Sequence, residues 1–450
     1  MSTALLEKYD VPAPRYTSYP TVPFWDTIPP DSGSWEAMVQ ETFESTNLSD
    51  GISLYVHLPF CERLCTYCGC NTRITINHGV EKVYIAAVLK EWSRYRALFG
   101  QRPRIRELHF GGGTPTFFSA ENLDILLNGL LQDADLAEWY EFSFEAHPGN
   151  TTSDHLRVFY QHGFRRISIG VQDFDPKVLE IINRFQTRDE VEKLTADARE
   201  MGYQSINFDL VYGLPLQQHG SFVRTIEVVC KLRPDRIALY SYAHVPWIKP
   251  GQRKFTEADL PSPKQKLALY SAACERLLEA GYIGIGMDHF SLPGDRLNKA
   301  AASGTLHRNF MGYTTSSTRL LIGLGVSAIS DAGKGYVQNE KVVEKYYGSL
   351  EEKRFPFFKG HLMSPTDLEL RRHILNIMCR FKTEWNPGDP LVAAARTQLE
   401  DAERDGLLEL GTGALLVTPL GRSFLRNICM AFDQKYWLSK TGKLLFSQAV

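Results

Sequence analysis

Short runs rich in β-branched and aromatic residues alternate with amphipathic stretches through the first half of the chain. The stretches Val83–Leu98 and Arg188–Glu200 repeat apolar residues with the period of a helix. Six other runs predict strands: Ile52–Leu58, Ile105–Phe110, Glu141–Glu145, Arg166–Gln172, Ile206–Tyr212 and Arg236–Tyr242. Alternation of strands and helices at this spacing predicts an α/β fold with a parallel sheet or barrel.

Unusual segments follow directly after the predicted strands. Pro59–Cys70 follows the first strand, Gly111–Pro115 the second and His147–Gly149 the third. Parallel α/β folds bind ligands at the carboxyl edge of their strands, so we expect these segments to meet there. Six such units predict a partial (β/α)6 barrel that is open on one side to admit a large substrate.

The two ends of the chain differ from this pattern. Residues 1–50 are rich in proline and aromatic residues, which predicts an ordered N-terminal arm packed on a main domain of residues 51–355. Residues 356–450 predict a mostly helical C-terminal domain that resembles a winged helix. Its expected elements are helices over Asp367–Phe381, Pro390–Glu403 and Pro419–Cys429 and a hairpin over Leu407–Thr418.

Charge and composition narrow the choice of partners. The 450 residues are 43% hydrophobic and carry a formal net charge of −2, so nothing favours nucleic acid or an anionic membrane as a partner. The chain shows neither an apolar run of about 18 residues nor a basic segment leading into an apolar one, so we expect a cytoplasmic protein. In that compartment clustered thiols are more often metal ligands or catalysts than disulfides.

Half of the eight cysteines lie within ten residues, at positions Cys61, Cys65, Cys68 and Cys70. A structural zinc site would need four ligands, usually in two separated pairs, and no second pair follows. Buried free thiols suit a loop with charged neighbours poorly. An iron–sulfur cluster fits best, because thiolates ligate its irons and the spacing Cys-x3-Cys-x2-Cys lets one loop reach three corners.

A cluster held by three cysteines leaves one iron with an open coordination position, as catalytic metal sites have. A ligand that offers an amine and a carboxylate could fill that position. The other four cysteines lie in apolar helical contexts and predict core residues: Cys230, Cys274, Cys379 and Cys429.

The cysteine loop and the next strand end resemble the radical S-adenosylmethionine (SAM) superfamily. Cys61-x3-Cys65-x2-Cys68, with Tyr67 before the last cysteine, is similar to its signature, and Phe110-Gly-Gly-Gly-Thr-Pro115 is similar to its glycine-rich segment. Further segments narrow the resemblance to the oxygen-independent coproporphyrinogen III oxidase (HemN) family over almost the whole chain. They are Pro14–Pro20, Cys68–Cys70, Gly170–Phe174, Asp209–Pro215, Gly286–Phe290, His307–Phe310, Gly325–Ser330 and Arg426–Cys429.

This resemblance implies one [4Fe-4S] cluster, ligated by Cys61, Cys65 and Cys68, and two SAM molecules. Arg184 would suit the methionine carboxylate of SAM, because guanidinium and carboxylate pair through two hydrogen bonds. The glycines would let the backbone approach SAM closely. The implied contacts of the two SAM molecules are Tyr55, Tyr67, Cys70, Gly112, Gly113, Thr114, Glu145, Gln172, Arg184, Asp209, Val211, Ala243 and Ile329.

Cys70 and three basic residues complete the expected site. Cys70 is too close to Cys68 to ligate the same cluster comfortably, so we expect a catalytic thiol that points into the cavity. The alternative is that Cys70 is only a small residue after Gly69. Arg15, His307 and Arg308 are candidates for binding substrate carboxylates.

The resemblance implies conversion of coproporphyrinogen III to protoporphyrinogen IX without oxygen, a step of haem biosynthesis. A 5′-deoxyadenosyl radical from SAM would take hydrogen from two propionates, each of which loses CO₂ and becomes a vinyl group. The expected partners are coproporphyrinogen III, a low-potential electron donor such as flavodoxin or ferredoxin, and an unidentified electron acceptor, with the chain a monomer.

Rival interpretations stay open at this point. One is a radical methyltransferase that degrades haem, and another is a haem chaperone similar to this family. Such chaperones typically lack the arm and the last cysteine of Cys68-Gly-Cys70, and this chain has both. A plain electron carrier is disfavoured by the open iron and by the length of the chain.

Overall fold

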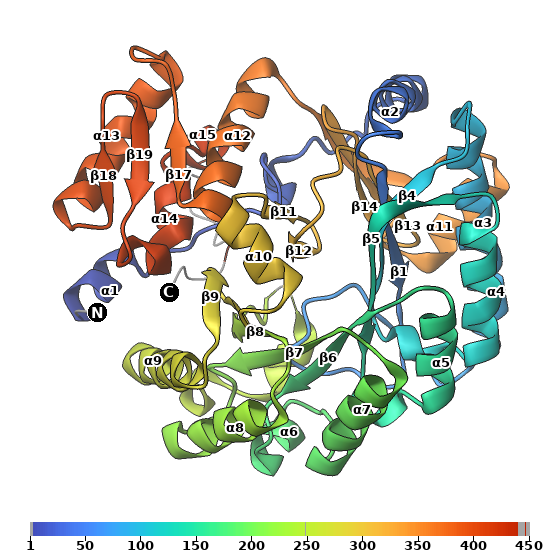
Figure 1. The fold of residues 1–450 in the computed structure, drawn as a ribbon, viewed down its shortest axis with the longest axis horizontal. Coiled ribbons are helices and arrows are strands. Elements are labelled where there is room, and N and C mark those ends of the chain that lie inside the picture. Colours follow the sequence, from blue (N-terminus) through green and yellow to red (C-terminus); the bar gives the residue numbers. More distant parts are fainter. Residues whose placement is uncertain (1–2, 248, 440–445, 447–450) are drawn as a thin grey trace.

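The computed structural model describes residues 3–247, 249–439 and 446, and its centre is a 12-stranded sheet (Figure 1). Six neighbouring strands run parallel in chain order and form a partial barrel. They are β1 (Ile52–Leu58), β4 (Arg104–Gly112), β5 (Asp135–Ala146), β6 (Arg166–Gln172), β7 (Ser205–Tyr212) and β8 (Arg236–Ser241). The predicted α/β fold class and all six predicted strands are confirmed.

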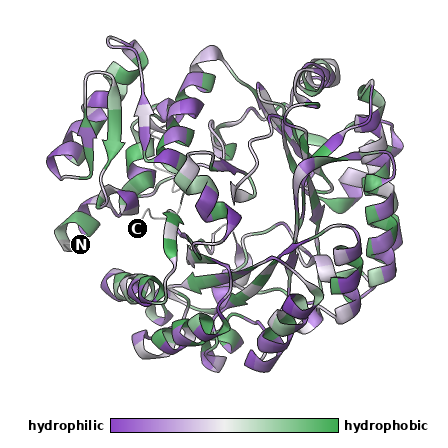
Figure 2. Cartoon of the chain, in the orientation of Figure 1, coloured by the Kyte–Doolittle hydropathy of each residue, from purple (hydrophilic) through white to green (hydrophobic). Residues whose placement is uncertain are grey.

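Helices link these strands and cover the outer side of the curved sheet (Figure 1). They are α3 (Val80–Leu98), α4 (Ala120–Leu131), α5 (Ser153–Gln161), α6 (Pro176–Ile181), α7 (Arg188–Met201), α8 (His219–Leu232) and α9 (Pro263–Glu279). Figure 2 shows hydrophilic residues on their outer sides. Strand residues such as Leu54, Leu108 and Ile167 are fully buried, as expected for parallel strands covered by helices.

Helix α7 shows how the sequence sets these boundaries. The side chains of Thr187 and Glu190 each accept a hydrogen bond from the other's backbone N–H, which caps the first turn. The helix ends at Gly202, whose φ of 99° is a left-handed conformation that glycine adopts at little cost. Between these ends Val191 and Leu194 are buried against the sheet side.

The sheet continues beyond the six predicted strands. β13 (Leu321–Leu324) pairs in parallel with β1, and three antiparallel strands follow it: β14 (Ile329–Asp331), β15 (Gly335–Asn339) and β16 (Phe357–Leu362). At the other end β8 pairs with β10 (His289–Ser291), which pairs with β9 (Ile283–Gly286). Four of these strands, β9, β10, β13 and β14, have only three or four residues, which is too short to show an alternating pattern. β16 places sheet residues beyond the predicted domain boundary at 355.

Four short elements lie between these added strands along the chain: α10 (Arg296–Ser303), β11 (His307–Asn309), β12 (Gly312–Thr314) and α11 (Val343–Glu351). Among the residues that the structure describes, no helix has both the length and the apolar content needed to cross a membrane.

The C-terminal region consists of helices and a small antiparallel sheet of order β17-β19-β18. Its elements are α12 (Pro365–Arg380), β17 (Lys382–Glu384), α13 (Pro390–Arg404), β18 (Leu408–Leu410), β19 (Ala414–Val417), α14 (Leu425–Met430) and α15 (Gln434–Leu438). The hairpin expected over Leu407–Thr418 is present. The helix expected over Pro419–Cys429 begins instead as a 3-10 turn at Gly421, which packs so closely on Leu407 that an added Cβ would lie 1.8 Å from its carbonyl oxygen.

The N-terminal arm lies between the C-terminal region and the sheet. Its helix α1 (Thr3–Tyr9) and its buried Tyr16 and Tyr19 belong to the hydrophobic core of the C-terminal region. The Tyr16 hydroxyl donates a hydrogen bond to Asp433 at 3.1 Å. By contrast α2 (Ser32–Thr46) packs into the main core, so residues 1–50 divide into two parts with different neighbours.

Candidate active site

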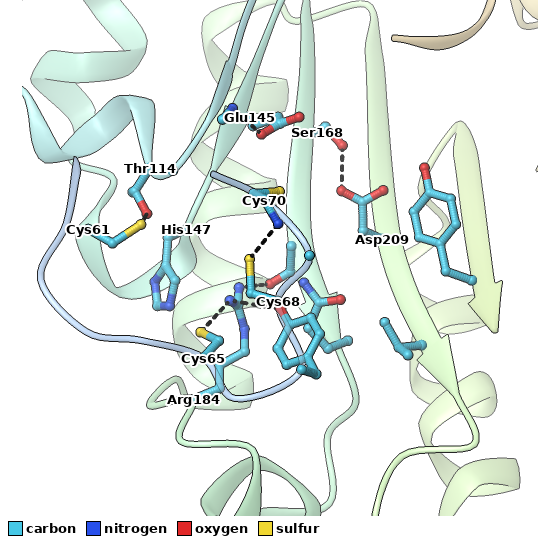
Figure 3. Close-up of a pocket in the computed structure, with 18 of the residues that line it drawn as sticks. Cys61, Cys65, Cys68, Cys70, Thr114, Glu145, His147, Ser168, Arg184 and Asp209 are labelled. Atoms are coloured by element: carbon cyan, nitrogen blue, oxygen red, sulfur yellow. Dashed lines mark hydrogen bonds between the residues drawn. The ribbon is translucent and has the colours of Figure 1, made fainter. Parts of the chain in front are cut away.

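A loop that leaves β1 carries the four clustered cysteines (Figure 3). Two short strands close its base, because β2 (Phe60–Cys61) pairs in parallel with β3 (Arg73–Ile74). Lys249 donates a hydrogen bond to the Gly69 carbonyl at 2.8 Å and holds the far side of the loop. The backbone of the loop is thus held by its own contacts, and the cysteine side chains are available to a ligand.

All four cysteines line one cavity of about 910 Å³. The Cys61 sulfur lies 3.3 Å from the Thr114 hydroxyl, and the Cys65 sulfur lies 3.8 Å from an Arg184 guanidinium nitrogen. No cysteine among the described residues forms a disulfide. The sulfurs therefore belong to free thiols that face a common space.

The thiols fit a multi-iron cluster better than a single ion. No group of three His, Cys, Asp or Glu side chains in the described ranges converges closely enough to hold one metal ion. Zinc needs its ligands gathered around a single point, whereas each iron of a cluster takes its own thiolate. Cys61, Cys65 and Cys68 are spread around one loop, an arrangement that a cluster with several irons can use, and their role as its ligands stays a prediction.

Burial keeps two of these thiols protonated in the protein alone. It raises the pKa of Cys61 to about 12, against a smaller opposing effect of the hydrogen bond from Thr114. Burial also raises the pKa of Cys65, although the Arg184 guanidinium acts in the opposite direction. Because iron binds thiolates, loading a cluster here must release protons.

The glycine-rich segment packs tightly against the base of the cysteine loop. Gly112 has a φ of 115°, and an added Cβ would lie 2.7 Å from the His57 ring. At Gly113 a Cβ would lie 2.6 Å from the backbone carbonyl of Pro59. Packing of the protein itself therefore requires glycine at both positions, in addition to the close approach to a ligand that the sequence led us to expect.

Two carboxylates face the cavity from β5 and β7, the strands on either side of β6 (Figure 3). Glu145 accepts a hydrogen bond from the Gly112 backbone at 3.1 Å. Burial alone would raise the pKa of Glu145, but the His109 ring and the Gly112 N–H lower it below its ordinary value. Asp209 accepts a hydrogen bond from Ser168 at 2.9 Å, and burial together with the charge of Glu145 raises its pKa to about 6.

Arg184 lies against the cysteine loop and is only 7% exposed. Its guanidinium donates to Gln186 at 2.8 Å, to the Tyr67 hydroxyl at 3.4 Å and to the Gly170 carbonyl. Most of its donors are thus already engaged with the protein. An incoming carboxylate would share this guanidinium with Cys65 and Tyr67.

Most of the predicted site residues meet at the cavity. Those that line it are Arg15, Cys61, Cys65, Tyr67, Cys68, Cys70, Gly112, Gly113, Thr114, Glu145, Gln172, Arg184, Asp209, Val211 and Ala243. Tyr55 and Ile329 do not line it. The Tyr55 hydroxyl lies 3.1 Å from the His57 ring, and Ile329 lies half-buried in β14.

The three predicted substrate cations differ in their surroundings. Arg15 reaches the cavity and forms an ion pair with Asp288. His307 does not line the cavity, and burial together with the charge of Arg371 lowers its pKa to about 4, so it is neutral at pH 7. Arg308 does not line the cavity either, because it lies buried over the Tyr313 ring at 4.6 Å. His307 and Arg308 thus lie outside this cavity, and their part in substrate binding stays a prediction.

Several polar residues that line the cavity are not among the site residues predicted above. Ser168 and Asn207 both hydrogen-bond to Asp209, and polar residues within otherwise apolar strands are a signal that could have found them. His109, Tyr240 and His289 also line the cavity. His289 and Tyr240 lie on strands that become neighbours only in the folded sheet, so sequence alone offers no signal for their pairing.

Comparison with known proteins places the chain among relatives of the same length. Residues 55–229 match the Radical SAM superfamily. The oxygen-independent coproporphyrinogen III oxidase of Synechocystis sp. is 38% identical over 462 residues, which cover 100% of this chain and 98% of that protein. The protein of the same name from Escherichia coli K12 is 38% identical over 455 residues, which cover 99% of this chain and 98% of the relative.

A solved structure shows the same fold over nearly the whole chain. The structure of coproporphyrinogen III oxidase (HemN) from Escherichia coli, described as a radical SAM enzyme, superposes with a TM-score of 0.89 and 36% sequence identity. The superposition covers 96% of this chain and 98% of that one. The likeness therefore includes the arm and the C-terminal region as well as the barrel.

Proposed function

The chain belongs to the oxygen-independent coproporphyrinogen III oxidase family, and from that membership we propose how its residues divide the work of the reaction. It is a radical SAM enzyme that oxidises two propionate side chains of coproporphyrinogen III to vinyl groups, with loss of CO₂, to give protoporphyrinogen IX. The observation that carries this function is the meeting of the cysteine loop, the glycine-rich segment and two strand-borne carboxylates in one cavity.

We propose that Cys61, Cys65 and Cys68 hold a [4Fe-4S] cluster. When bound, the cluster and SAM supply the hydrogen-atom abstraction that begins each decarboxylation. Thr114 lies beside Cys61, and the Arg184 guanidinium lies beside Cys65. Both donors stabilise negative charge on the thiolates that they face.

We further propose that the residues around this loop bind two SAM molecules. A zwitterionic amino acid needs cations for its carboxylate and anions for its ammonium, and the cavity offers Arg184 on one side and Glu145 and Asp209 on the other. Gly112, Gly113 and Thr114 offer backbone and hydroxyl groups, and Gln172, Val211 and Ala243 complete the walls. Tyr55 acts at one remove, because its ring stacks with the ring of His109, which lines the cavity, and the contact of Ile329 with SAM stays a prediction.

Cys70 is proposed as the thiol that serves the substrate or the second SAM. It lines the cavity, and its backbone N–H donates to the Cys68 sulfur at 3.4 Å. The thiols of Cys70 and Cys68 also hydrogen-bond to each other, which places the Cys70 side chain beside the proposed cluster.

The arm is proposed to keep the cavity closed during the reaction, since water and oxygen would quench a radical. Arg15 reaches the cavity from the arm, and Tyr16 next to it is anchored by Asp433 in the C-terminal region. We also propose a monomer that works in the cytoplasm with a low-potential donor such as flavodoxin or ferredoxin and an unidentified electron acceptor, without nucleic acid or membrane. The reduced thiols support this compartment.

The test is turnover under strict anaerobiosis. Full-length protein loaded with iron and sulfide is incubated with SAM, a reductant and coproporphyrinogen III, and the tetrapyrroles are separated by chromatography. We expect protoporphyrinogen IX together with methionine and deoxyadenosine. Tight haem binding without vinyl product would instead favour a haem chaperone.

A further inference from the structure

A second cavity, of about 340 Å³, lies where the arm, the barrel and the C-terminal region meet. Figure 1 shows α1, α9 and α14, which border it, on the same side of the molecule. Residues from all of these parts line it, among them Leu6, Arg15, Tyr212, Lys266, Ser423 and Arg426. No residue proposed to bind the cluster or SAM lines this cavity.

Arg15 stands where the two cavities meet. It lines both of them, as does Ser241 at the end of β8. Its guanidinium lies over the Tyr240 ring at 5.3 Å and pairs with Asp288, while its side chain stays 34% exposed. A guanidinium has five N–H donors, so Arg15 can keep Asp288 and still bind a second carboxylate.

Lys266 supplies a cation that has no direct carboxylate partner among the described residues. Its ammonium donates to the Tyr242 carbonyl at 3.3 Å and lies over the Tyr212 ring at 5.9 Å, while Asp10 on the same cavity wall attracts it without forming an ion pair. Its alkyl chain packs against Gly213. A partly buried ammonium whose only hydrogen-bond partner is a carbonyl can still bind an anion.

The rest of the cavity combines apolar and charged residues. Leu6, Leu267, Met287 and Tyr270 form much of its apolar wall. The charged residues of its lining are the carboxylates Glu7, Asp10 and Asp288 and the cations Arg15, Lys264, Lys266 and Arg426. An apolar wall on which cations outnumber carboxylates suits an apolar ring edge with an attached carboxylate.

The volume of the main cavity also bears on where the substrate can bind. Pockets of roughly 300–1,000 Å³ hold one drug-sized ligand. The main cavity, at about 910 Å³, must take a cluster, SAM and a tetrapyrrole macrocycle. A macrocycle whose propionates are all bound therefore needs space beyond the main cavity. The second cavity adjoins the main cavity at Arg15.

We propose that the second cavity is a subsite for a propionate-bearing edge of the macrocycle, whose carboxylate binds Lys266 and Arg15. This proposal rests on the proposed function, because it assumes coproporphyrinogen III as the substrate. It assigns to the second cavity a propionate that is not being decarboxylated. The reacting propionate stays in the main cavity.

The test measures binding of coproporphyrin III, the fluorescent oxidised form of the substrate, to the cluster-loaded full-length chain. Lys266→Met keeps the apolar stem and removes the charge, so we expect folded protein that binds the probe roughly tenfold more weakly. The matched control is Lys193→Met on α7, whose ammonium pairs with Asp197 outside both cavities, and it should bind like the parent.

A second variant tests the space rather than the charge. Ser423→Phe adds a ring to the cavity wall from the C-terminal region and should weaken binding by at least the same factor. If both variants bind as tightly as the parent, the proposal is overturned. If only Ser423→Phe binds more weakly, the carboxylate does not bind Lys266 and the proposal as stated is also overturned.

Failure of this subsite and failure of the proposed function give different results. A parent that forms vinyl product while both variants bind normally removes only the subsite. A parent that makes deoxyadenosine but never forms vinyl product removes the proposed function, whatever the binding experiment shows.

Discussion

The hydroxyl of Thr114 lies 3.3 Å from the sulfur of Cys61, although 53 positions separate the two residues in the chain. This contact joins the glycine-rich segment at the end of β4 to the cysteine loop that follows β1. Hydrogen bonds to cluster sulfurs raise the reduction potential, because they stabilise the more negative, reduced state.

Thr114→Val should therefore lower the midpoint potential of the cluster. The loss of one hydrogen bond worth about 1 kcal/mol corresponds to about 40 mV for a one-electron couple. A redox titration followed by electron paramagnetic resonance measures the shift, with Thr305→Val, distant from the cavity lining, as the control. A potential equal to that of the parent would show that this hydroxyl does not act on the cluster.

Gly113→Ala should destabilise the protein and impair cluster loading. The added Cβ would lie 2.6 Å from the Pro59 carbonyl at the base of the cysteine loop, a contact that costs about 1–3 kcal/mol of unfolding free energy. Gly100→Ala is the matched control, since nothing lies within 4 Å of its added Cβ. Denaturant unfolding and iron content measure both variants, and equal stability of the two would contradict the described packing.

Cys70→Ser should separate cluster binding from turnover. The backbone N–H of Cys70 still donates to the Cys68 sulfur in this variant, and the serine hydroxyl can replace the thiol in its hydrogen bond to Cys68. Iron content and SAM cleavage should therefore stay near those of the parent. Vinyl product should fall at least tenfold, the size expected when a positioned catalytic group is lost. Loss of iron in this variant would instead make Cys70 a cluster ligand.

His307→Gln should change the pH dependence of stability and leave substrate binding at pH 7.5 unaltered. The pKa of His307 is about 4 in the folded protein and near 6.5 when unfolded, so the unfolded state binds the extra proton between these values. The parent therefore loses stability as the pH falls from 6.5 to 4, by about 2 kcal/mol more than the variant after allowance for partial exposure. Urea unfolding at several pH values measures the difference. Parallel curves of unfolding free energy against pH for the two proteins would contradict the prediction.

The sequence predicted the barrel because each of its six parallel strands contains a run of five or more residues that is enriched in apolar, β-branched and aromatic side chains. The strands that extend the sheet escaped prediction, since β14 and β10 are only three residues long and are set by pairing with distant neighbours. Within the site, residues at strand ends could be placed because parallel strands share one carboxyl edge.

Other parts of the site depend on tertiary contacts that no local pattern reveals. Arg15 pairs with Asp288 across 273 positions, and that contact decides how the arm approaches the cavity. His307 and Arg308 are predicted as substrate ligands because they are basic, whereas their place outside the cavity follows from the packing of β11 on α12. The number of SAM molecules and the electron partners stay predictions.

The most direct test of the central claim is deoxyadenosine release from anaerobic protein that carries about four irons per chain. We predict release by the parent and by Cys230→Ser, whose thiol lies outside the cavity, and none by Cys65→Ser. Fully loaded parent that releases no deoxyadenosine, or a Cys65→Ser variant that releases as much as the parent, would contradict the account.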